Sequence, residues 1–461
     1  MSIRAGVAAH HPATAAAGLE VLRRGGTACD AAVAATLASC VAETTMTGLG
    51  GGGHAITWDA AARLARTFDF FVAVPGLDGT PDTSAAVVVP IVFETETVPY
   101  IVGAGSVGVP GVAAGCEALW RSGGRLPWRT LVEPALALAR IGVALPPSHA
   151  RVLDMLAELM TRNEGGRIYA PGGALLAAGG VMRAPGLVAA LELLRDEGAS
   201  TFYRGSVAKV LLELMRERGG PLTEADLEAY EVVEAVPAEA VYAGRRILAR
   251  RDLAGMLTTL DRLPPLGGLA PGPRALALAD ALTGVEGPGH TTNVAVADTD
   301  GNACVVTTSL GLGSGDWLPG LDVHLNSMLG ELDLQRAVPI PGERMGSMIV
   351  PTLVLEGEEL EVAAGAAGGS RIRSALVQSL AGLLSEGLDP RSAVEQARLH
   401  PVGEVVHTEP GFADDAVAAL TAAGRDVRRW QTRHHYFGGV SLVARGGPAA
   451  DSRRDGAALL L

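Results

Sequence analysis

The sequence of 461 residues predicts an α+β protein built in layers. Its opening and its middle third carry the three- and four-residue spacing of apolar side chains that is typical of helices. After residue 291 the spacing changes to two, which is typical of strands. In both halves strand-like segments lead through glycines into helical segments, so sheets and helices are expected to pack as separate layers.

The first half begins with two Ala-rich helices. Gly25 and Gly26 end the first helix, and Thr27 is a suitable N-cap for the second. Thr223 and Asp226 have the spacing of a capping box, so a further helix is expected to start there. The elements expected in this half are helices at 13–24 and 27–42, strands at 54–58 and near 67–71 after the glycine run 48–53, and successive helices over 110–218.

The second half follows a segment at 263–289 that is rich in Pro, Gly and Leu and therefore reads as an exposed loop. Two strand patterns come next, joined by Asp298-Thr299-Asp300-Gly301-Asn302, which is a strong signal for a hairpin. The elements expected here are strands at 292–297, 303–308, 348–355 and 361–364, and a helix at 371–384.

The composition excludes several classes of partner. A formal net charge of −13 provides no basic field to attract nucleic acid or an anionic membrane. No segment reaches the roughly 18 uninterrupted apolar residues of a spanning helix, and the start of the chain has no signal-peptide pattern, so a cytoplasmic protein is expected. The four cysteines, Cys29, Cys40, Cys116 and Cys304, lack metal-ligand spacing. Three of them lie in segments rich in Ala and Val and are expected to be small buried side chains.

Local motifs for other functions are weak. Gly50–Gly53 lacks the Gly-Lys-Ser/Thr of a phosphate loop. Asp298–Gly301 resembles half of a calcium loop, but strands flank it and Ser309 stands where such a loop needs Glu. The histidines show no His-Glu-x-x-His pattern, so neither a metal nor another cofactor is expected. A Ser/His/Asp hydrolase stays open, because a triad is assembled in space rather than in sequence.

Thr291 is the strongest candidate for a chemical role. The segment Gly289-His290-Thr291-Thr292 brings a threonine from a loop to the start of a strand. Cleavage of the His290–Thr291 bond would give Thr291 a free α-amine beside its own hydroxyl. An α-amine has an ordinary pKa of about 7.7–8.0, so it can act as the general base for that hydroxyl. By itself the motif would be an ordinary strand start.

The surrounding segments change that interpretation, because their order resembles the γ-glutamyltranspeptidase family of N-terminal-nucleophile hydrolases. The first segment, His11-Pro12-Ala13-Thr14 onward, and the strand start Thr291-Thr292 are similar to the openings of the family's two subunits. Matches in the same order run over most of the chain, at residues 11–34, 43–53, 106–111, 124–128, 291–303, 351–352, 368–372 and 451–456.

This resemblance implies a four-layer αββα sandwich and self-cleavage between His290 and Thr291. The products would be a large portion, 1–290, and a small portion, 291–461, which together form one fold. Thr291 would attack a carbonyl, form an acyl-enzyme, and pass the acyl group to water or to an acceptor amine. The two portions are therefore expected partners, and the resemblance is also compatible with a homodimer of processed units.

The resemblance also implies roles for individual residues. Gly368 and Gly369 match the glycines whose amides would stabilise the oxyanion, and Ser309 falls on a position that supports the nucleophile. Asn326 and Ser347 fall on motifs of the substrate pocket.

The departures from the family's pattern concern the substrate. Phe71 stands where the family has an arginine that grips the α-carboxylate of the γ-glutamyl group, and a phenyl ring cannot make this bidentate contact. Gly330 and Glu331 stand where the family has an acidic pair that holds the α-amino group, and Glu331 is expected to replace part of that contact with the substrate. Gly311 replaces a supporting asparagine. We therefore expect a small-molecule amide as substrate, with a more apolar or differently charged acyl group than γ-glutamyl.

Three other interpretations are open at this point. The first is ordinary γ-glutamyl hydrolysis or transfer, with the missing contacts supplied from elsewhere. The second is a specialised biosynthetic member that hydrolyses unusual amides or C–C bonds. The third, from a different class, is a non-catalytic scaffold or binding protein, which the changes at Phe71 and Gly311 and the short segment before Thr291 favour.

Overall fold

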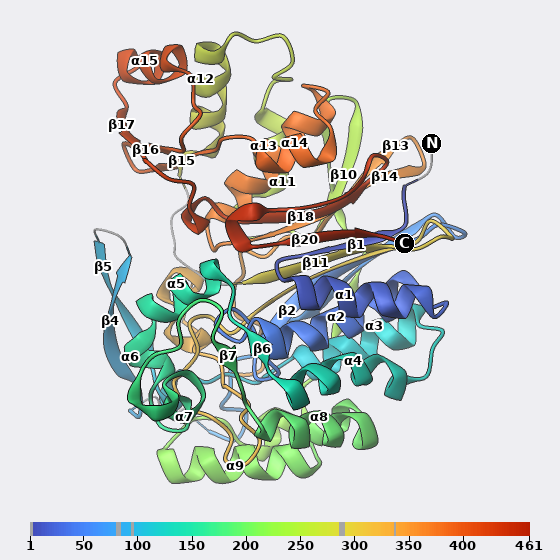
Figure 1. The fold of residues 1–461 in the computed structure, drawn as a ribbon, viewed down its shortest axis with the longest axis vertical. Helices are drawn as coiled ribbons and strands as arrows, with labels where there is room; N and C mark the ends of the chain where they lie inside the picture. Colours follow the sequence, from blue (N-terminus) through green and yellow to red (C-terminus); the bar gives the residue numbers. More distant parts are fainter. Residues whose placement is uncertain (1–2, 80–83, 94–95, 285–290, 336–337) are drawn as a thin grey trace.

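The computed structural model describes residues 3–79, 84–93, 96–284, 291–335 and 338–461. Two antiparallel sheets pack face to face, and helices cover the outer face of each sheet (Figure 1). This αββα sandwich confirms both the predicted α+β class and the four layers that the resemblance implied.

The first sheet has seven strands and carries most of the first half's core. In spatial order its strands are β20 (Ala457–Leu460), β1 (Gly6–Ala9), β11 (Thr292–Ala297), β12 (Ala303–Ser309), β2 (Gly52–Asp59), β3 (Leu64–Phe70) and β8 (Val233–Ala235). Against its outer face lie α1 (Pro12–Arg23), α2 (Ala28–Ala42) and α3 (Val112–Gly123). Farther out, α4 (Trp128–Ile141) packs on α2, α8 (Gly186–Glu197) packs on α4, and α9 (Ser206–Arg218) lies beside α8.

The second sheet has six strands: β19 (Gly447–Ala450), β18 (Gly439–Ala444), β14 (Glu359–Ala367), β13 (Thr352–Glu356), β10 (Arg245–Ala249) and β9 (Ala238–Tyr242). Against its outer face lie α11 (Met256–Arg262), α13 (Arg371–Leu384) and α14 (Pro390–Glu395). Beyond them, α12 (Pro271–Leu282) and α15 (Asp414–Ala422) pack on each other. Between the sheets lies a separate apolar core that includes Ile56, Val305, Leu353 and Val443.

Smaller elements surround this frame. They are helices α5 (Pro147–Met155), α6 (Ala157–Met160), α7 (Gly165–Tyr169) and α10 (Glu224–Glu228), the sheet of β15 (Leu399–Val402), β16 (Val405–Thr408) and β17 (Asp426–Arg429), and the strand pairs β4 (Val87–Phe93) with β5 (Glu96–Val102) and β6 (Val143–Ala144) with β7 (Val181–Met182).

Chain portions 1–290 and 291–461 both supply strands to each of the two sheets. In the first sheet, β11 and β12 lie between β1 and β2, and β11 also packs on β14 and β18 of the second sheet. Each side of the predicted cleavage site therefore completes the other side's sheets.

Local sequence signals set most of the boundaries. Thr27 caps α2, as expected, and forms a capping box with Asp30. Thr223 and Asp226 form the expected capping box at the start of α10. The expected hairpin joins β11 to β12, with Thr292 paired to Thr308.

Two element predictions need correction. The segment 263–289, predicted to be a loop, contains the helix α12. Pro271 lies in the first helical turn, where the missing backbone N–H loses no hydrogen bond. The Ala and Leu residues that follow bury one face of the helix in the apolar core on the side of the second sheet. Residues 285–289 of that loop lie outside the described residues. The strand predicted from Met348 begins only at Thr352. The guanidinium of Arg250 donates to the carbonyls of Ser347 and Ile349, so these groups are not available for strand pairing. Residues 347–349 instead form part of a pocket wall.

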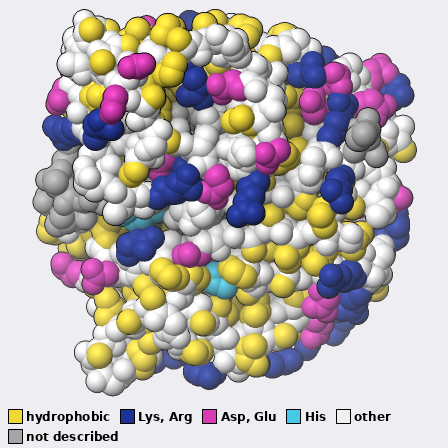
Figure 2. All heavy atoms as spheres, turned by 45° about the horizontal axis from the view of Figure 1, so that its top comes forward, with side chains coloured by type: hydrophobic (Ala, Val, Ile, Leu, Met, Phe, Trp, Pro, Cys, Tyr) yellow, Lys and Arg dark blue, Asp and Glu magenta, His cyan; other side chains and the backbone are white. Residues whose placement is uncertain are grey.

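Acidic and basic side chains lie interspersed on the face drawn in Figure 2. Within the ranges that the structure describes, no helix has the length and hydropathy of a membrane-crossing segment. All four cysteines are buried and free, which includes the three that were expected to be buried.

Candidate active site

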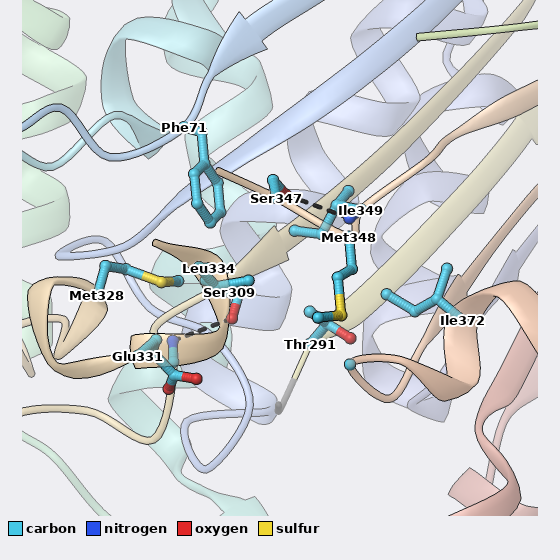
Figure 3. Close-up of a pocket in the computed structure, with 12 residues that line it drawn as sticks. Phe71, Thr291, Ser309, Met328, Glu331, Leu334, Ser347, Met348, Ile349 and Ile372 are labelled. Carbon is cyan, nitrogen blue, oxygen red and sulfur yellow. Dashed lines mark hydrogen bonds between the residues drawn. The ribbon is translucent and has the colours of Figure 1, made fainter. Parts of the chain in front are cut away.

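A narrow pocket opens where β11 begins and β14 ends, with a cavity volume of about 30 Å³ (Figure 3). Most of the residues expected to act on substrate meet there. Its described lining comprises Phe71, Thr291, Ser309, Gly311, Met328, Glu331, Leu334, Ser347, Met348, Ile349, Gly369 and Ile372.

Thr291 directly precedes β11, an inner strand of the first sheet that faces the second sheet. Its side chain lies at the pocket, and the residue is only 4% exposed. The Thr291 Oγ accepts a hydrogen bond of 2.8 Å from the Gly368 N–H. The other half of the predicted cleavage site, His290, lies outside the described residues.

Gly368 and Gly369 form the turn from β14 into α13. Their φ angles of +131° and +60° favour glycine, and a Cβ at Gly368 would lie 3.0 Å from the Gly438 Cα. The turn thus brings a backbone N–H against the Thr291 hydroxyl at the positive end of the 14-residue helix α13. Backbone donors near a helix N-terminus are suited to stabilise a developing negative charge on oxygen.

Ser309, Gly311 and Glu331 form one wall of the pocket. Ser309 ends β12, and its Oγ accepts a hydrogen bond of 3.0 Å from the Gly311 N–H (Figure 3). Gly311 has a φ of +67°, and a Cβ there would lie 2.6 Å from Oε1 of Glu331. The absence of a side chain at position 311 therefore leaves the space that the Glu331 carboxylate occupies.

Phe71 and Ser347 belong to the opposite wall. The Phe71 ring stacks on His54, with centroids 5.2 Å apart and planes 16° apart. Ser347 Oγ accepts a hydrogen bond of 3.2 Å from the Ile349 N–H (Figure 3). Arg250 approaches this wall from behind, where its guanidinium donates to the backbone carbonyls of Ser347 and Ile349.

Asn326, expected in the substrate pocket, lies outside the pocket lining. Its side-chain N–H₂ donates to the carbonyls of Gly50 and Gly108, each at 2.9 Å. Its Oδ1 accepts from the N–H groups of Gly108 and Met328. Because these bonds use its donors and both lone pairs, Asn326 fastens the glycine run to the segment that carries Glu331.

Glu43 is a buried residue of this region to which sequence reasoning assigned no role. Its carboxylate accepts a hydrogen bond of 2.6 Å from the Thr14 hydroxyl and another from the hydroxyl of Thr292, the neighbour of the nucleophile candidate. Burial raises the pKa of Glu43 to about 7, against the opposing effect of these two hydroxyls and of Arg454. Glu43 therefore anchors the start of β11 and titrates near neutral pH.

The C-terminal motif supplies the charge opposite Glu43. Asp451 forms buried ion pairs with Arg398 at 2.7 Å and with Arg453 at 3.0 Å, and these fix the turn that presents Arg454. Segments 43–53 and 451–456 both matched the family's order, but nothing in their spacing showed that they meet in space.

Glu43→Gln is expected to alter the pH dependence of stability. Between about pH 4.5 and 7, Glu43 keeps a proton in the folded state that it releases in the unfolded chain. The stabilising contribution of Glu43 to the free energy of unfolding is therefore complete below about pH 4.5 and is lost as the pH rises through 7. Relative to Glu43→Gln, the wild-type free energy of unfolding should fall by about 3 kcal/mol across this window.

Urea unfolding at about pH 5 and about pH 8 measures this effect. Glu358→Gln, a change to an exposed glutamate in the turn between β13 and β14, is the matched control and should track the wild type. Parallel pH profiles for the wild type and Glu43→Gln would contradict the assignment.

The described residues contain no group of three or more His, Cys, Asp or Glu side chains arranged to hold a metal ion. The polar groups that the described lining offers are the hydroxyls of Thr291, Ser309 and Ser347, backbone N–H groups and the carboxylate of Glu331.

Comparison with known proteins agrees with this arrangement. Residues 14–260 and 273–461 match the family model described as Gamma-glutamyltranspeptidase. A glutathione hydrolase proenzyme of Bacillus subtilis (strain 168) is 26% identical, over 98% of this chain and 91% of that protein. An acylase ACY 1 proenzyme of Pseudomonas sp. (strain V22) is 28% identical, over 95% of this chain and 89% of that protein.

Similarity of structure extends over the whole fold. The crystal structure of cephalosporin acylase from Bacillus halodurans has a TM-score of 0.83 at 24% identity, covering 100% of this chain and 96% of that chain. The family model matches nearly the whole sequence on both sides of Thr291, and the chain therefore belongs to the γ-glutamyltranspeptidase family.

Proposed function

We propose that this protein is a self-processing threonine amidohydrolase or acyltransferase that forms an acyl intermediate on Thr291. The observation that carries the proposal is the Thr291 Oγ at the pocket, with the Gly368 N–H bound to it at 2.8 Å. This arrangement suits a nucleophile whose attack creates negative charge next to a backbone donor.

Processing would cut the His290–Thr291 bond and leave the portions 1–290 and 291–461. Both portions supply strands to both sheets, so the two portions are expected to stay associated after the bond is cut. The relatives named glutathione hydrolase proenzyme and acylase ACY 1 proenzyme carry precursor status in their names, which supports processing here.

The reaction would then use groups of the chain alone. The freed α-amine of Thr291 takes the hydroxyl proton as the Oγ attacks the amide carbonyl. The N–H groups of Gly368 and Gly369 stabilise the oxyanion, and the departing amine leaves with the proton. Water or an acceptor amine attacks the acyl-Thr291 ester and regenerates the enzyme. Ser309, on the adjoining wall, supports the position of the nucleophile.

The donor would lack the α-carboxylate of a γ-glutamyl group. None of the twelve described residues of the lining carries a positive charge, and Phe71 stands on the wall. The guanidinium of Arg250 is committed to backbone carbonyls behind that wall. A carboxylate in this pocket would therefore lose its hydration without gaining an ionic partner.

Phe71→Arg is expected to raise kcat/KM for a γ-glutamyl anilide, relative to an unsubstituted alkanoyl anilide, by at least about tenfold, because a guanidinium can bind the α-carboxylate. Phe71→Leu, which keeps the wall apolar, should leave this ratio close to that of the wild type. The measurement is release of p-nitroaniline by the processed proteins.

The wild type alone tests the broader proposal in the same screen. Turnover of at least one acyl anilide by processed protein supports an amidohydrolase, and release from none of a broad acyl series would contradict it. A wild-type preference for the γ-glutamyl anilide above all other donors would contradict the proposed donor specificity.

A further inference from the structure

Arg454 is a buried arginine that lies beside the Gly368 turn and forms no ion pair within the described parts of the chain. We propose that Arg454 is a positioning residue for the reaction at Thr291. Its positive charge acts through the turn to keep the α-amine of the processed Thr291 neutral and to favour negative charge on the attacked carbonyl oxygen. The inference rests on the proposed function and concerns the base and the oxyanion of the same site.

The position of the guanidinium follows from two glycines. The C-terminal turn, which the Asp451 ion pairs fix, presents Arg454 with only 2% of its surface exposed. Gly439 leaves room for the stem, because a Cβ there would collide with the Arg454 Cγ. A Cβ on Gly368 would lie 3.4 Å from the Arg454 Nη2, and the Gly368 N–H donates to the Thr291 Oγ at 2.8 Å. The guanidinium therefore lies against the turn that contacts the nucleophile.

The charge of Arg454 is not neutralised at close range. Among the described residues its guanidinium reaches one acceptor, the Met46 Sδ, at 3.5 Å, and the Arg454 Nε is buried without a partner. The nearby Asp451 carboxylate is taken by Arg398 and Arg453. A buried charge without a partner lowers the stability of a protein, and perturbed ionisable groups of this kind concentrate at functional sites.

Glu43 is the anion that can offset this charge. Burial raises the pKa of Glu43 to about 7, against the opposing effects of two hydroxyls and of Arg454. Below about pH 7 Glu43 is therefore protonated and does not offset the charge of Arg454, whereas above this pH its carboxylate weakens the field. Burial lowers the pKa of Arg454 itself to about 10, against the opposing charges of Asp451 and Glu43, so the guanidinium stays charged in the neutral range.

The other groups around Arg454 and Glu43 keep one charge state between about pH 5 and 9. Burial raises the pKa of the Cys40 thiol well above its ordinary value, so it stays neutral. Arg371 at the start of α13, Arg398 before β15 and Asp451 stay ionised. Burial lowers the pKa of the neighbouring histidines well below neutral, and these are His10, His11, His149 and His434.

A positive charge near Thr291 matters because of the ordinary pKa of an α-amine. An α-amine with a pKa of about 7.7–8.0 is mostly protonated at about pH 7 and cannot accept the hydroxyl proton. A nearby cation disfavours the ammonium form and lowers this pKa. Two unit charges about 10 Å apart, in surroundings with an effective dielectric constant of about 20, change a pKa by about one unit. The same field favours an oxyanion beside the Gly368 N–H.

The wild type gives the first test. Protein labelled with nitrogen-15 threonine and allowed to process carries one free threonine α-amine, at Thr291, because every other threonine nitrogen lies in a peptide bond. Titration of its nitrogen-15 chemical shift should give a pKa of about 7 or below. A pKa of about 7.7 or above, the ordinary value, would overturn the inference.

Arg454→Met removes the charge and keeps an unbranched stem that can pack on Gly439. We expect it to raise both the amine pKa and the acidic limb of kcat/KM by about one unit, so that turnover at about pH 6, relative to the alkaline plateau, falls by about tenfold. Arg454→Lys, which keeps a charge, should shift both values by less than about half as much. Arg63→Met removes an exposed charge from the turn between β2 and β3 and should leave both values unchanged.

Glu43 also titrates near neutral pH, so the acidic limb of kcat/KM must be assigned to one group. Glu43→Gln removes that titration. Arg454→Met in this background should still raise the acidic limb by about one unit. If the shift disappears in the Glu43→Gln background, the limb belongs to Glu43 and the inference fails.

The remaining outcomes separate this inference from the proposed function. Loss of turnover in Arg454→Met without any shift of the amine pKa would show a merely structural residue and overturn the inference. Wild-type turnover with an ordinary amine pKa would do the same and leave the proposed amidohydrolase standing. A wild type that is neither cut nor active would overturn the proposed function and this inference together. If Arg454→Met fails to fold, the wild-type titration decides.

Discussion

Thr291→Ala is expected to leave the chain uncut and to lower amide turnover by at least about 10⁴-fold, the scale on which loss of a catalytic nucleophile acts. The variant removes the hydroxyl that would attack both the His290–Thr291 bond and the substrate. A denaturing gel, N-terminal sequencing of any smaller fragment and p-nitroaniline release measure the two effects.

Stability is not expected to explain this loss. Removing the Thr291 hydroxyl costs one hydrogen bond from Gly368, about 1 kcal/mol. Thr291→Ser keeps a hydroxyl and, once cut, an α-amine, so it should still process and turn over amides. A wild-type chain that stays permanently intact, and behaves like Thr291→Ala, would favour the non-catalytic interpretation instead.

Gly368→Ala is expected to lower kcat by about 10²–10³-fold, the usual effect of losing one oxyanion donor. The new Cβ would lie 3.0 Å from the Gly438 Cα and 3.4 Å from both the Arg371 Cβ and the Arg454 Nη2, so the turn must shift. That shift moves the N–H that now contacts the Thr291 Oγ. Steady-state kinetics with the best donor measures the loss.

Gly357→Ala is the matched control for backbone strain. Gly357 has a φ of +62° in the turn between β13 and β14, and a Cβ there meets no atom within 4 Å. Both variants should lose about 1–3 kcal/mol of unfolding free energy from strain. Only Gly368→Ala should lose kcat, and equal losses of kcat in both variants would contradict an oxyanion role for the turn.

Helix and strand boundaries could be read from the sequence where local physical rules decide them. The capping box at Thr27 and the hairpin before β12 depend on residues that are neighbours in the chain. The prediction failed at α12, where Pro and Gly in the first turn hid a helix that is held by packing against α15 and the apolar core on that side of the second sheet. The predicted strand start at Met348 was also wrong, because the Ile349 carbonyl accepts a hydrogen bond from the Arg250 guanidinium instead of pairing with a neighbouring strand.

The candidate site divides in the same way. Thr291, Gly368 and Gly369 could be chosen because each lies in a short motif of recognisable order, and the structure places Thr291 and Gly368 in contact. Asn326 could not be judged from its motif, because its role depends on which backbone groups surround it. Glu43 could not be found at all, since its partners come from Thr14, Thr292 and the C-terminal turn.

By itself, then, the sequence determined the layered class, the family resemblance and the choice of Thr291. Motif order, turn chemistry and periodicity can be read from the residues along the chain, without knowledge of the tertiary structure. Only the tertiary structure decided how these residues meet around the nucleophile: the described lining of the pocket is largely apolar, and the Glu331 carboxylate lies in the space that Gly311 leaves. The physical reason is that the electrostatic potential and the shape of a site depend on which segments, distant in the sequence, exclude water from one another. The close packing of the two sheets determines which segments these are.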